Sequence, residues 1–242
     1  LQLMGTYNLN SQQSLIGFWT NLYRGVYRSN IVVNRTPGIE GMSEEKKTRI
    51  ISEARFLRAF YYHILWKFWG SIPYYTVNPN GAEVGYIVPQ LTEDEVYEKI
   101  MEDLDAATAP GALPKAVAMT EVGRANRYAA YMLRADVVML KGDESRYASV
   151  LEQLRETINS GIYELTPKFE DIWTDKGEWN CESIFEINYS DDPSNRTWED
   201  PLAPGGTVFP VFLGPDSYKG KRFHSEGYGF GPVSPALKAV YE

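Results

Sequence analysis

Apolar residues recur at steps of three and four along much of the first 160 residues, the spacing that lines one face of an α-helix. The most aromatic of these stretches is EARFLRAFYYHILWKFWG, residues 53–70, where Phe56, Phe60 and Trp66 fall on one face. Because a stripe at helical spacing is typical of a buried face, these three rings are predicted to belong to the core.

The ends of this helix also carry signals in the sequence. Ser43 is the expected N-cap, and Gly70 is the expected C-terminal cap, three residues before Pro73. Arg55 and Arg58 stand beside the apolar stripe, and we expect them to pair with carboxylates or helix ends rather than with a ligand.

Four further helices are predicted, at residues 14–34, 92–107, 125–142 and 147–158. Thr92 and Glu95 form a capping box at the start of the second of these. Gly161 supplies a left-handed cap after the last one. The predicted buried positions, in chain order, are Leu15, Phe18, Leu22, Val26 and Tyr27; Val96, Ile100 and Leu104; Ala125, Ala129, Met132, Ala135 and Met139; and Tyr147, Val150, Leu151, Leu154 and Ile158.

The last two helices and their turn span about 35 residues, close to the length of a tetratricopeptide repeat, about 34 residues. The pattern predicts a mainly α fold of tetratricopeptide-like helical hairpins, with long irregular loops and a few short strands. One short strand is expected in ESIFEINY, residues 182–189, where side chains alternate. Residues 190–235 are rich in Pro, Gly, Asp and Ser and are predicted to be a long functional loop.

Composition excludes several classes of function. The chain has 242 residues and a net charge of −8, which argues against a nucleic-acid partner because phosphate binding needs clustered Lys and Arg. Nearly all of the excess lies in residues 170–199, with nine acidic and two basic side chains. No apolar run reaches the roughly 18 residues of a membrane-spanning helix. The start, LQLMGTYNLN, lacks the features of a signal peptide.

The sequence gives no sign of a catalytic or metal centre. Cys181 is the single cysteine, and with only two histidines there is no zinc-binding spacing. Asp191 and Asp192 are adjacent, whereas a glycosidase needs two carboxyl groups facing each other across the substrate. We therefore expect no enzymatic activity, no cofactor and no metal.

Four stretches together resemble the SusD/RagB family of nutrient-binding outer-membrane lipoproteins. They are FWTNLYRGVYRSNIVV; EARFLRAFYYHILWKFWGSIPYYT, with Trp69 where Phe is usual; GRANRYAAYMLRADVVMLKGD followed by INSGIYEL; and FEDIWTDKGEWNCESIFEINYS. They occur in the family's order and cover nearly the whole chain. The combination is specific, although no single stretch would suffice.

The resemblance implies that this chain is an internal piece of a larger protein. Family members are about twice as long and begin with a signal peptide and a lipid-modified cysteine, a role that Cys181 does not fit because it lies inside the fold region. Residues 1–242 are then a single, incomplete SusD-like domain, with a helical core at about 12–161 and an irregular region at 162–242. The whole protein would be anchored in the outer membrane at the cell surface.

The resemblance also implies a function. The protein would capture an oligosaccharide and deliver it to a TonB-dependent, SusC-like β-barrel transporter. Two alternatives stay open: a peptide-binding lid of the RagB type, and a helical-repeat interaction scaffold without a small ligand. A glycan array separates the binding protein from the scaffold.

Trp198 is the first candidate for ligand contact, because it lies in SNRTWEDP, where no periodicity explains an indole. Asn195 and Arg196 beside it would take sugar hydroxyl groups while the ring stacks on the sugar. Trp179 and Tyr7 are further candidates; the resemblance places Tyr7 at the edge of the ligand face. Other aromatic residues are expected to serve packing, namely Tyr74, Tyr75 and, by resemblance to a buried family position, Trp173.

Overall fold

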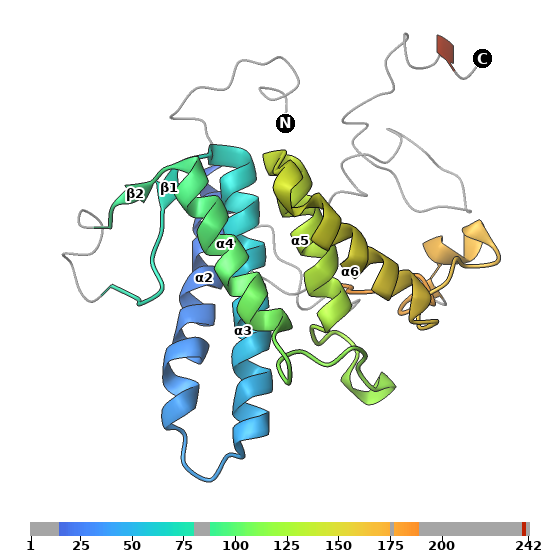
Figure 1. Cartoon of the computed structure of the whole chain (residues 1–242), viewed down its shortest axis with the longest axis horizontal. Coiled ribbons are helices and arrows are strands. Elements are labelled where there is room, and N and C mark those ends of the chain that lie inside the picture. The colour runs from blue at the N-terminus through green and yellow to red at the C-terminus, as the bar shows by residue number, and fades with distance from the viewer. Residues whose placement is uncertain (1–14, 80–87, 175–176, 189–238, 241–242) are drawn as a thin grey trace, which may run out of the picture. The chain divides into compact units, whose positions relative to one another are not determined.

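The computed structural model describes residues 15–79, 88–174, 177–188 and 239–240, and these contain five main α-helices (Figure 1). The chain divides into two compact units, residues 1–187 and 188–242, and the elements below belong to the first. The helices are α2 (Ile16–Arg35), α3 (Glu44–Trp69), α4 (Glu93–Thr108), α5 (Arg127–Lys141) and α6 (Tyr147–Asn159). Strands β1 (Ile72–Pro73) and β2 (Gln90–Leu91) form one short antiparallel pair. The 3₁₀ turns are η2 (Thr36–Gly38), η4 (Met119–Glu121), η5 (Glu144–Arg146) and η6 (Phe169–Trp173).

The helices pack in chain order, each against the next, from α2 to α6. In Figure 1, α2 and α3 form a long hairpin, and α5 and α6 form a second, shorter one. The predicted mainly α fold of helical hairpins is therefore confirmed. None of the helices in the described ranges is both long and apolar enough to cross a membrane.

The predicted helix ends are confirmed by the capping contacts. The Ser43 hydroxyl accepts a hydrogen bond from the Lys46 backbone N–H, and Gly70 ends α3 in a positive-φ conformation. Thr92 and Glu95 make both hydrogen bonds of a capping box at the start of α4. These local signals are strong enough to fix where α3 and α4 begin.

The core lies between α2, α3, α4 and α5. Phe56 and Trp66 are buried as predicted, whereas Phe60 is half-buried. The α4 stripe of Val96, Ile100 and Leu104 is completely buried. Along α2, Leu22 and Val26 are buried, but Phe18 and Tyr27 are exposed.

The predicted buried face of α5 is partly wrong. Ala129 and Ala135 are buried, whereas Met132 and Met139 are exposed. Helix α5 is covered around most of its circumference, because α3, α4 and α6 all contact it. The strip that carries the two methionines is the side that these neighbours leave open.

The predicted buried stripe of α6 is also partly wrong. Val150 is buried, but Tyr147, Leu151 and Ile158 are exposed, and Leu154 is partly buried. Within the described part of the chain, α5 is the one long helix that packs closely on α6. Much of the apolar stripe of α6 is therefore exposed to solvent, next to the exposed strip of α5.

Two predictions for the irregular region are wrong. Residues 182–188 form no strand; the Glu186 carboxylate turns back to the Ser183 hydroxyl and the Trp179 backbone N–H, which bends the segment. Trp173, expected in the core, is 74% exposed and lies in η6, where it contacts the edge of Phe169. The predicted loop at 190–235 lies outside the described residues.

Candidate functional site

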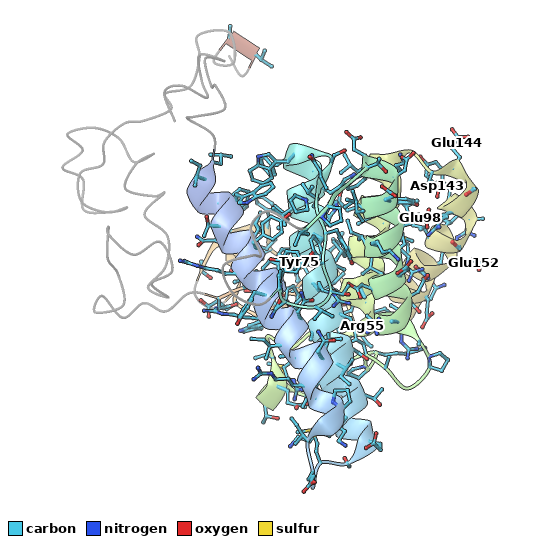
Figure 2. All side chains as sticks on the ribbon, turned by 90° about the vertical axis from the view of Figure 1, so that its left-hand side faces the viewer. Arg55, Tyr75, Glu98, Asp143, Glu144 and Glu152 are labelled. Carbon is cyan, nitrogen blue, oxygen red and sulfur yellow. The ribbon has the colours of Figure 1, made fainter. Side chains whose placement is uncertain are left out.

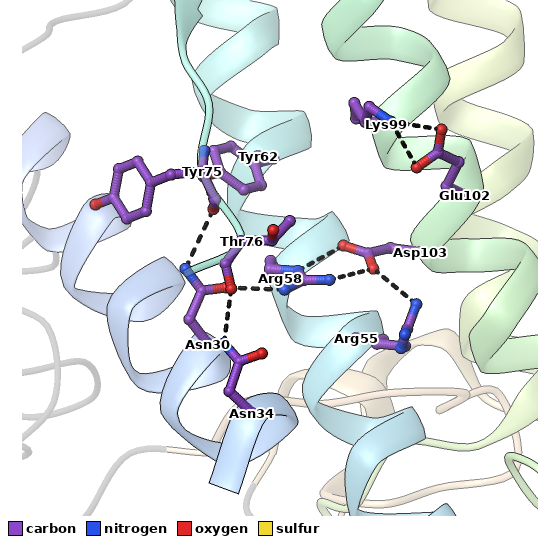
Figure 3. Close-up of polar contacts among 10 residues, drawn as sticks. All are labelled: Asn30, Asn34, Arg55, Arg58, Tyr62, Tyr75, Thr76, Lys99, Glu102 and Asp103. Atoms are coloured by element: carbon purple, nitrogen blue, oxygen red, sulfur yellow. Dashed lines mark hydrogen bonds and ion pairs between the residues drawn. The ribbon is translucent and has the colours of Figure 1, made fainter. Parts of the chain in front are cut away.

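The charged residues of the aromatic helix have a structural role. Arg58 is buried and donates to both carboxylate oxygens of Asp103, at 2.7 and 2.6 Å, and to the Asn30 side-chain oxygen at 2.8 Å (Figure 3). Arg55 reaches the same carboxylate at 3.5 Å. These contacts join α2, α3 and α4, so the predicted pairing of both arginines with carboxylates is confirmed.

The same network holds the segment that follows α3. The Asn30 amide donates to the Tyr75 carbonyl at 3.2 Å, and the Asn34 amide donates to the Thr76 carbonyl at 2.7 Å. The Tyr62 hydroxyl donates to the Tyr75 carbonyl and accepts from its N–H. Burial raises the pKa of Tyr62, which keeps this phenol protonated and able to donate.

The two tyrosines after the Pro turn serve packing, as predicted. Tyr74 stacks on Tyr62 with ring centroids 4.1 Å apart, and Tyr75 stacks on Tyr23 at 5.9 Å. In Figure 2, Tyr75 is seen on the side of the molecule that α2 occupies. Aromatic stacking and backbone hydrogen bonds thus fix residues 72–76 against the α2–α3 hairpin.

Of the predicted ligand-contact residues, Trp179 lies in the described part of the chain. Trp198, Asn195, Arg196 and Tyr7 lie outside the described residues. Trp179 is half-buried and has a φ of 55°, the one positive φ among the described non-glycine residues. Bulky side chains rarely adopt this left-handed conformation, which therefore needs fixed contacts to hold it.

Trp179 lines a cleft of about 210 Å³ between two irregular segments. One wall comes from residues 116–126, with Met119 and Gly123, and the other comes from residues 162–163 and 179–185. The Trp179 ring lies over Gly123: a Cβ placed there would be 3.4 Å from the ring, and the φ of Gly123 is 91°. Glycine suits this position both because of its φ and because of the ring above it.

Asn126 joins the two walls of the cleft. As the N-cap of α5, its side-chain oxygen accepts from the Ala129 N–H at 2.9 Å. Its amide donates to the Ile184 carbonyl at 2.9 Å and to the Tyr163 hydroxyl at 3.2 Å. Phe185, which follows Ile184 in the chain, packs edge-on against Phe56 of the core. The cleft is therefore attached to the helical core on both sides.

An ion-pair network supports the wall that carries Gly123. Arg124 donates to both carboxylate oxygens of Glu53 on α3, at 3.0 and 2.9 Å, and to Glu121 at 2.6 Å. Arg49 on α3 also bonds Glu121. Hydrogen bonds to Glu53, partly offset by burial, raise the pKa of Arg124, so its guanidinium is a permanent positive charge at the cleft. The sequence pattern did not indicate this wall, because its residues have no periodicity.

The described residues show no group of three or more His, Cys, Asp or Glu side chains placed to hold a metal ion. His63 faces Asp136 across α3 and α5, with Nε2 2.7 Å from the carboxylate, and the imidazole is buried. Burial lowers the pKa of His63, although Asp136 opposes this shift, so the ring is a neutral donor that ties the two helices.

Comparisons with known proteins agree with this architecture. A SusD-like family, described as starch-binding and associating with the outer membrane, matches residues 2–139. A SusD-like protein of Formosa agariphila is 27% identical over 91% of this chain and 42% of its own length.

Two solved structures are similar over nearly the whole chain. The surface glycan-binding protein A from Bacteroides thetaiotaomicron is 35% identical with a TM-score of 0.88, over 99% of this chain and 49% of that one. The same protein in complex with laminarihexaose is 36% identical with a TM-score of 0.83, over 93% of this chain and 46% of that one. The chain thus spans less than half the length of these relatives. Since the family match covers more than half of its residues, the chain belongs to the SusD-like family.

Proposed function

We propose that this chain is part of a cell-surface protein that binds an oligosaccharide. The observation that carries the proposal is the similarity to the laminarihexaose complex, at 36% identity over 93% of the chain with a TM-score of 0.83. Conservation of the helical framework to this degree supports a related ligand class. A β-linked glucan oligosaccharide is the first ligand to test.

We propose a binding role without catalysis. The buried ionisable groups described above, Arg58, Asp103 and His63, are engaged in ties between helices. A binding protein needs instead a rigid frame that presents aromatic rings and hydrogen-bonding groups to the sugar. The stacked tyrosines and capped helices supply such a frame.

The candidate contacts remain Trp198, Asn195, Arg196, Tyr7 and Trp179. Changing Trp198 to Ala in the full natural protein is expected to weaken glycan binding about 5- to 30-fold, equivalent to about 1–2 kcal/mol. Its melting temperature is expected to change little. Normal binding combined with early melting would show that Trp198 is a core residue.

We further propose that the whole protein is lipid-anchored at the outer membrane and delivers its glycan to a TonB-dependent β-barrel. The family's description as associating with the outer membrane supports this location. A stable assembly of this kind buries on the order of 2,000 Å² or more. Native protein extracted gently in detergent is expected to co-purify with a large β-barrel. Recovery as a free monomer would contradict the partner.

That residues 1–242 form an incomplete domain also stays a proposal. It is supported by the exposed apolar side chains of α5 and α6, which line a groove of about 470 Å³. Met132, Leu154, Ile158, Leu165 and Ile184 contribute to this groove. Stacked helical hairpins normally bury such faces against a further element.

A glycan array with peptide spots tests the ligand class. The proposal predicts binding to one group of oligosaccharides, with dissociation constants in the micromolar to millimolar range, about −8 to −4 kcal/mol. Binding to peptides alone would favour the RagB-type lid. No ligand of either kind would favour the interaction scaffold.

A further inference from the structure

The cleft beside Trp179 combines a stacking surface with hydrogen-bonding groups. The half-buried indole forms one side, and Met119, which is 75% exposed, forms part of the rim. The volume, about 210 Å³, is below the roughly 300 Å³ at which pockets for drug-sized ligands begin. The space therefore suits one small ring rather than a whole oligosaccharide.

The polar groups at the cleft keep donors available. The Tyr163 hydroxyl accepts from Asn126, and its own hydrogen has no acceptor among the described residues. Arg124 uses three of its five N–H groups on Glu53 and Glu121. No described residue accepts from the Trp179 indole N–H. Sugar hydroxyl groups accept such hydrogen bonds, while the apolar face of the sugar ring stacks on an indole.

The backbone of Trp179 is held in its unusual conformation by specific contacts. Its N–H donates to a Glu186 carboxylate oxygen at 2.9 Å, and the Ser183 hydroxyl donates to the same oxygen. The neighbouring Asn180 amide donates to the Gly177 carbonyl at 2.7 Å. A bulky residue in the left-handed region persists only where its surroundings fix it, and such residues cluster at ligand-binding sites.

A purely structural role for Trp179 would be to cover Gly123 and seal the loop. That role requires packing but does not require unpaired donors around the ring. Nor does it explain why the rim beside the indole carries an exposed methionine rather than a polar side chain. The combination of stacking surface, donors and fixed geometry fits a ligand better than a seal.

We propose that this cleft is a saccharide subsite that takes a single sugar ring, stacked on Trp179 and hydrogen-bonded by Tyr163 and Arg124. The subsite rests on the proposed glycan-binding function and extends it to a named position on the helical frame. Glu186 is a positioning residue, because it acts on the ring through the Trp179 backbone.

Calorimetric titration of the full natural protein with laminarihexaose tests the subsite. Trp179→Ala is expected to weaken binding about 5- to 30-fold, and Trp179→Phe, which keeps a flat ring, to recover most of the loss. Trp173→Ala is the matched control, since this indole lies in the same region but is 74% exposed, and it should bind as the wild type does.

A second variant guards against loss of folding. Met119 is exposed at the rim, so Met119→Ala should leave the melting temperature unchanged and weaken binding about 2- to 5-fold. If the wild type binds the glycan and both Trp179→Ala and Met119→Ala bind it with the wild-type affinity, the subsite is wrong and the glycan-binding function stands. If the wild type binds no glycan, the function fails and the subsite fails with it. Early melting of Trp179→Ala with unchanged affinity would assign the residue to packing.

Discussion

Replacing Arg58 by Met is expected to destabilise the fold by about 3–5 kcal/mol, the cost of leaving one member of a buried ion pair alone. The change leaves the Asp103 carboxylate, 2% exposed, with only Arg55 at 3.5 Å. It also removes the donor that reaches the Asn30 side-chain oxygen at 2.8 Å. An unsatisfied buried acceptor of this kind costs about 1–3 kcal/mol.

Urea unfolding followed by circular dichroism measures this cost as a shift in midpoint at constant slope. The double variant Arg58→Met/Asp103→Leu removes both buried charges and should cost only about 1–3 kcal/mol, because the Asn30 side-chain oxygen is the main buried group left without a partner. Arg55 also loses Asp103, but its side chain is 34% exposed and can be solvated. Lys99→Met is the control, since its pair with Glu102 is exposed on α4 and should contribute little. The reasoning is refuted if Arg58→Met costs less than about 1 kcal/mol. It is also refuted if the double variant costs as much as Arg58→Met and Asp103→Leu, measured separately, add up to.

Three further outcomes are expected. Trp66→Ala should lower the free energy of unfolding by about 3–5 kcal/mol, because a buried cavity opens, whereas Trp173→Ala should lower it little. Equal melting curves for the two variants would contradict this. His63 has a lowered pKa when folded, so the unfolded chain binds its proton first as the pH falls. The contribution of His63 to the free energy of unfolding is therefore complete above about pH 6.5 and is lost below it. The resulting slope of unfolding free energy against pH should vanish in His63→Gln but persist in His224→Gln. If the domain is incomplete as proposed, the 242-residue chain should bind a hydrophobic dye through α6, and Leu151→Glu should reduce that signal. Cooperative melting above ~60 °C without dye binding would contradict the proposal.

The sequence predicted the helices well because their signals are local. The Ser43 cap, the Thr92–Glu95 capping box and the glycine at position 70 each act within one turn of the helix they start or end. The apolar stripe of α6 shows the limit of such signals. Periodicity shows that a helix has an apolar face, but it does not show whether another element covers that face.

The cleft was not predictable in the same way. Its two walls are joined by a contact between distant residues, Asn126 with the Ile184 carbonyl, and the second wall is itself held together by the Glu164 N–H on the Cys181 carbonyl. Neither contact leaves a repeating pattern in the sequence. The sequence offers Trp179 as a further candidate for ligand contact, but its partner across the cleft, Gly123, carries no signal beyond being a glycine before a helix cap.

Calorimetric titration of the wild-type full natural protein with laminarihexaose tests the central claim most directly. The account predicts saturable binding with a dissociation constant between micromolar and millimolar, about −8 to −4 kcal/mol. A short glucan of a different linkage serves as the comparison ligand, and related glycans from the array extend the test. Absence of measurable heat and of any shift in melting temperature with every glycan tested, for a protein that unfolds cooperatively, would contradict the claim that this SusD-like chain belongs to a glycan-binding protein.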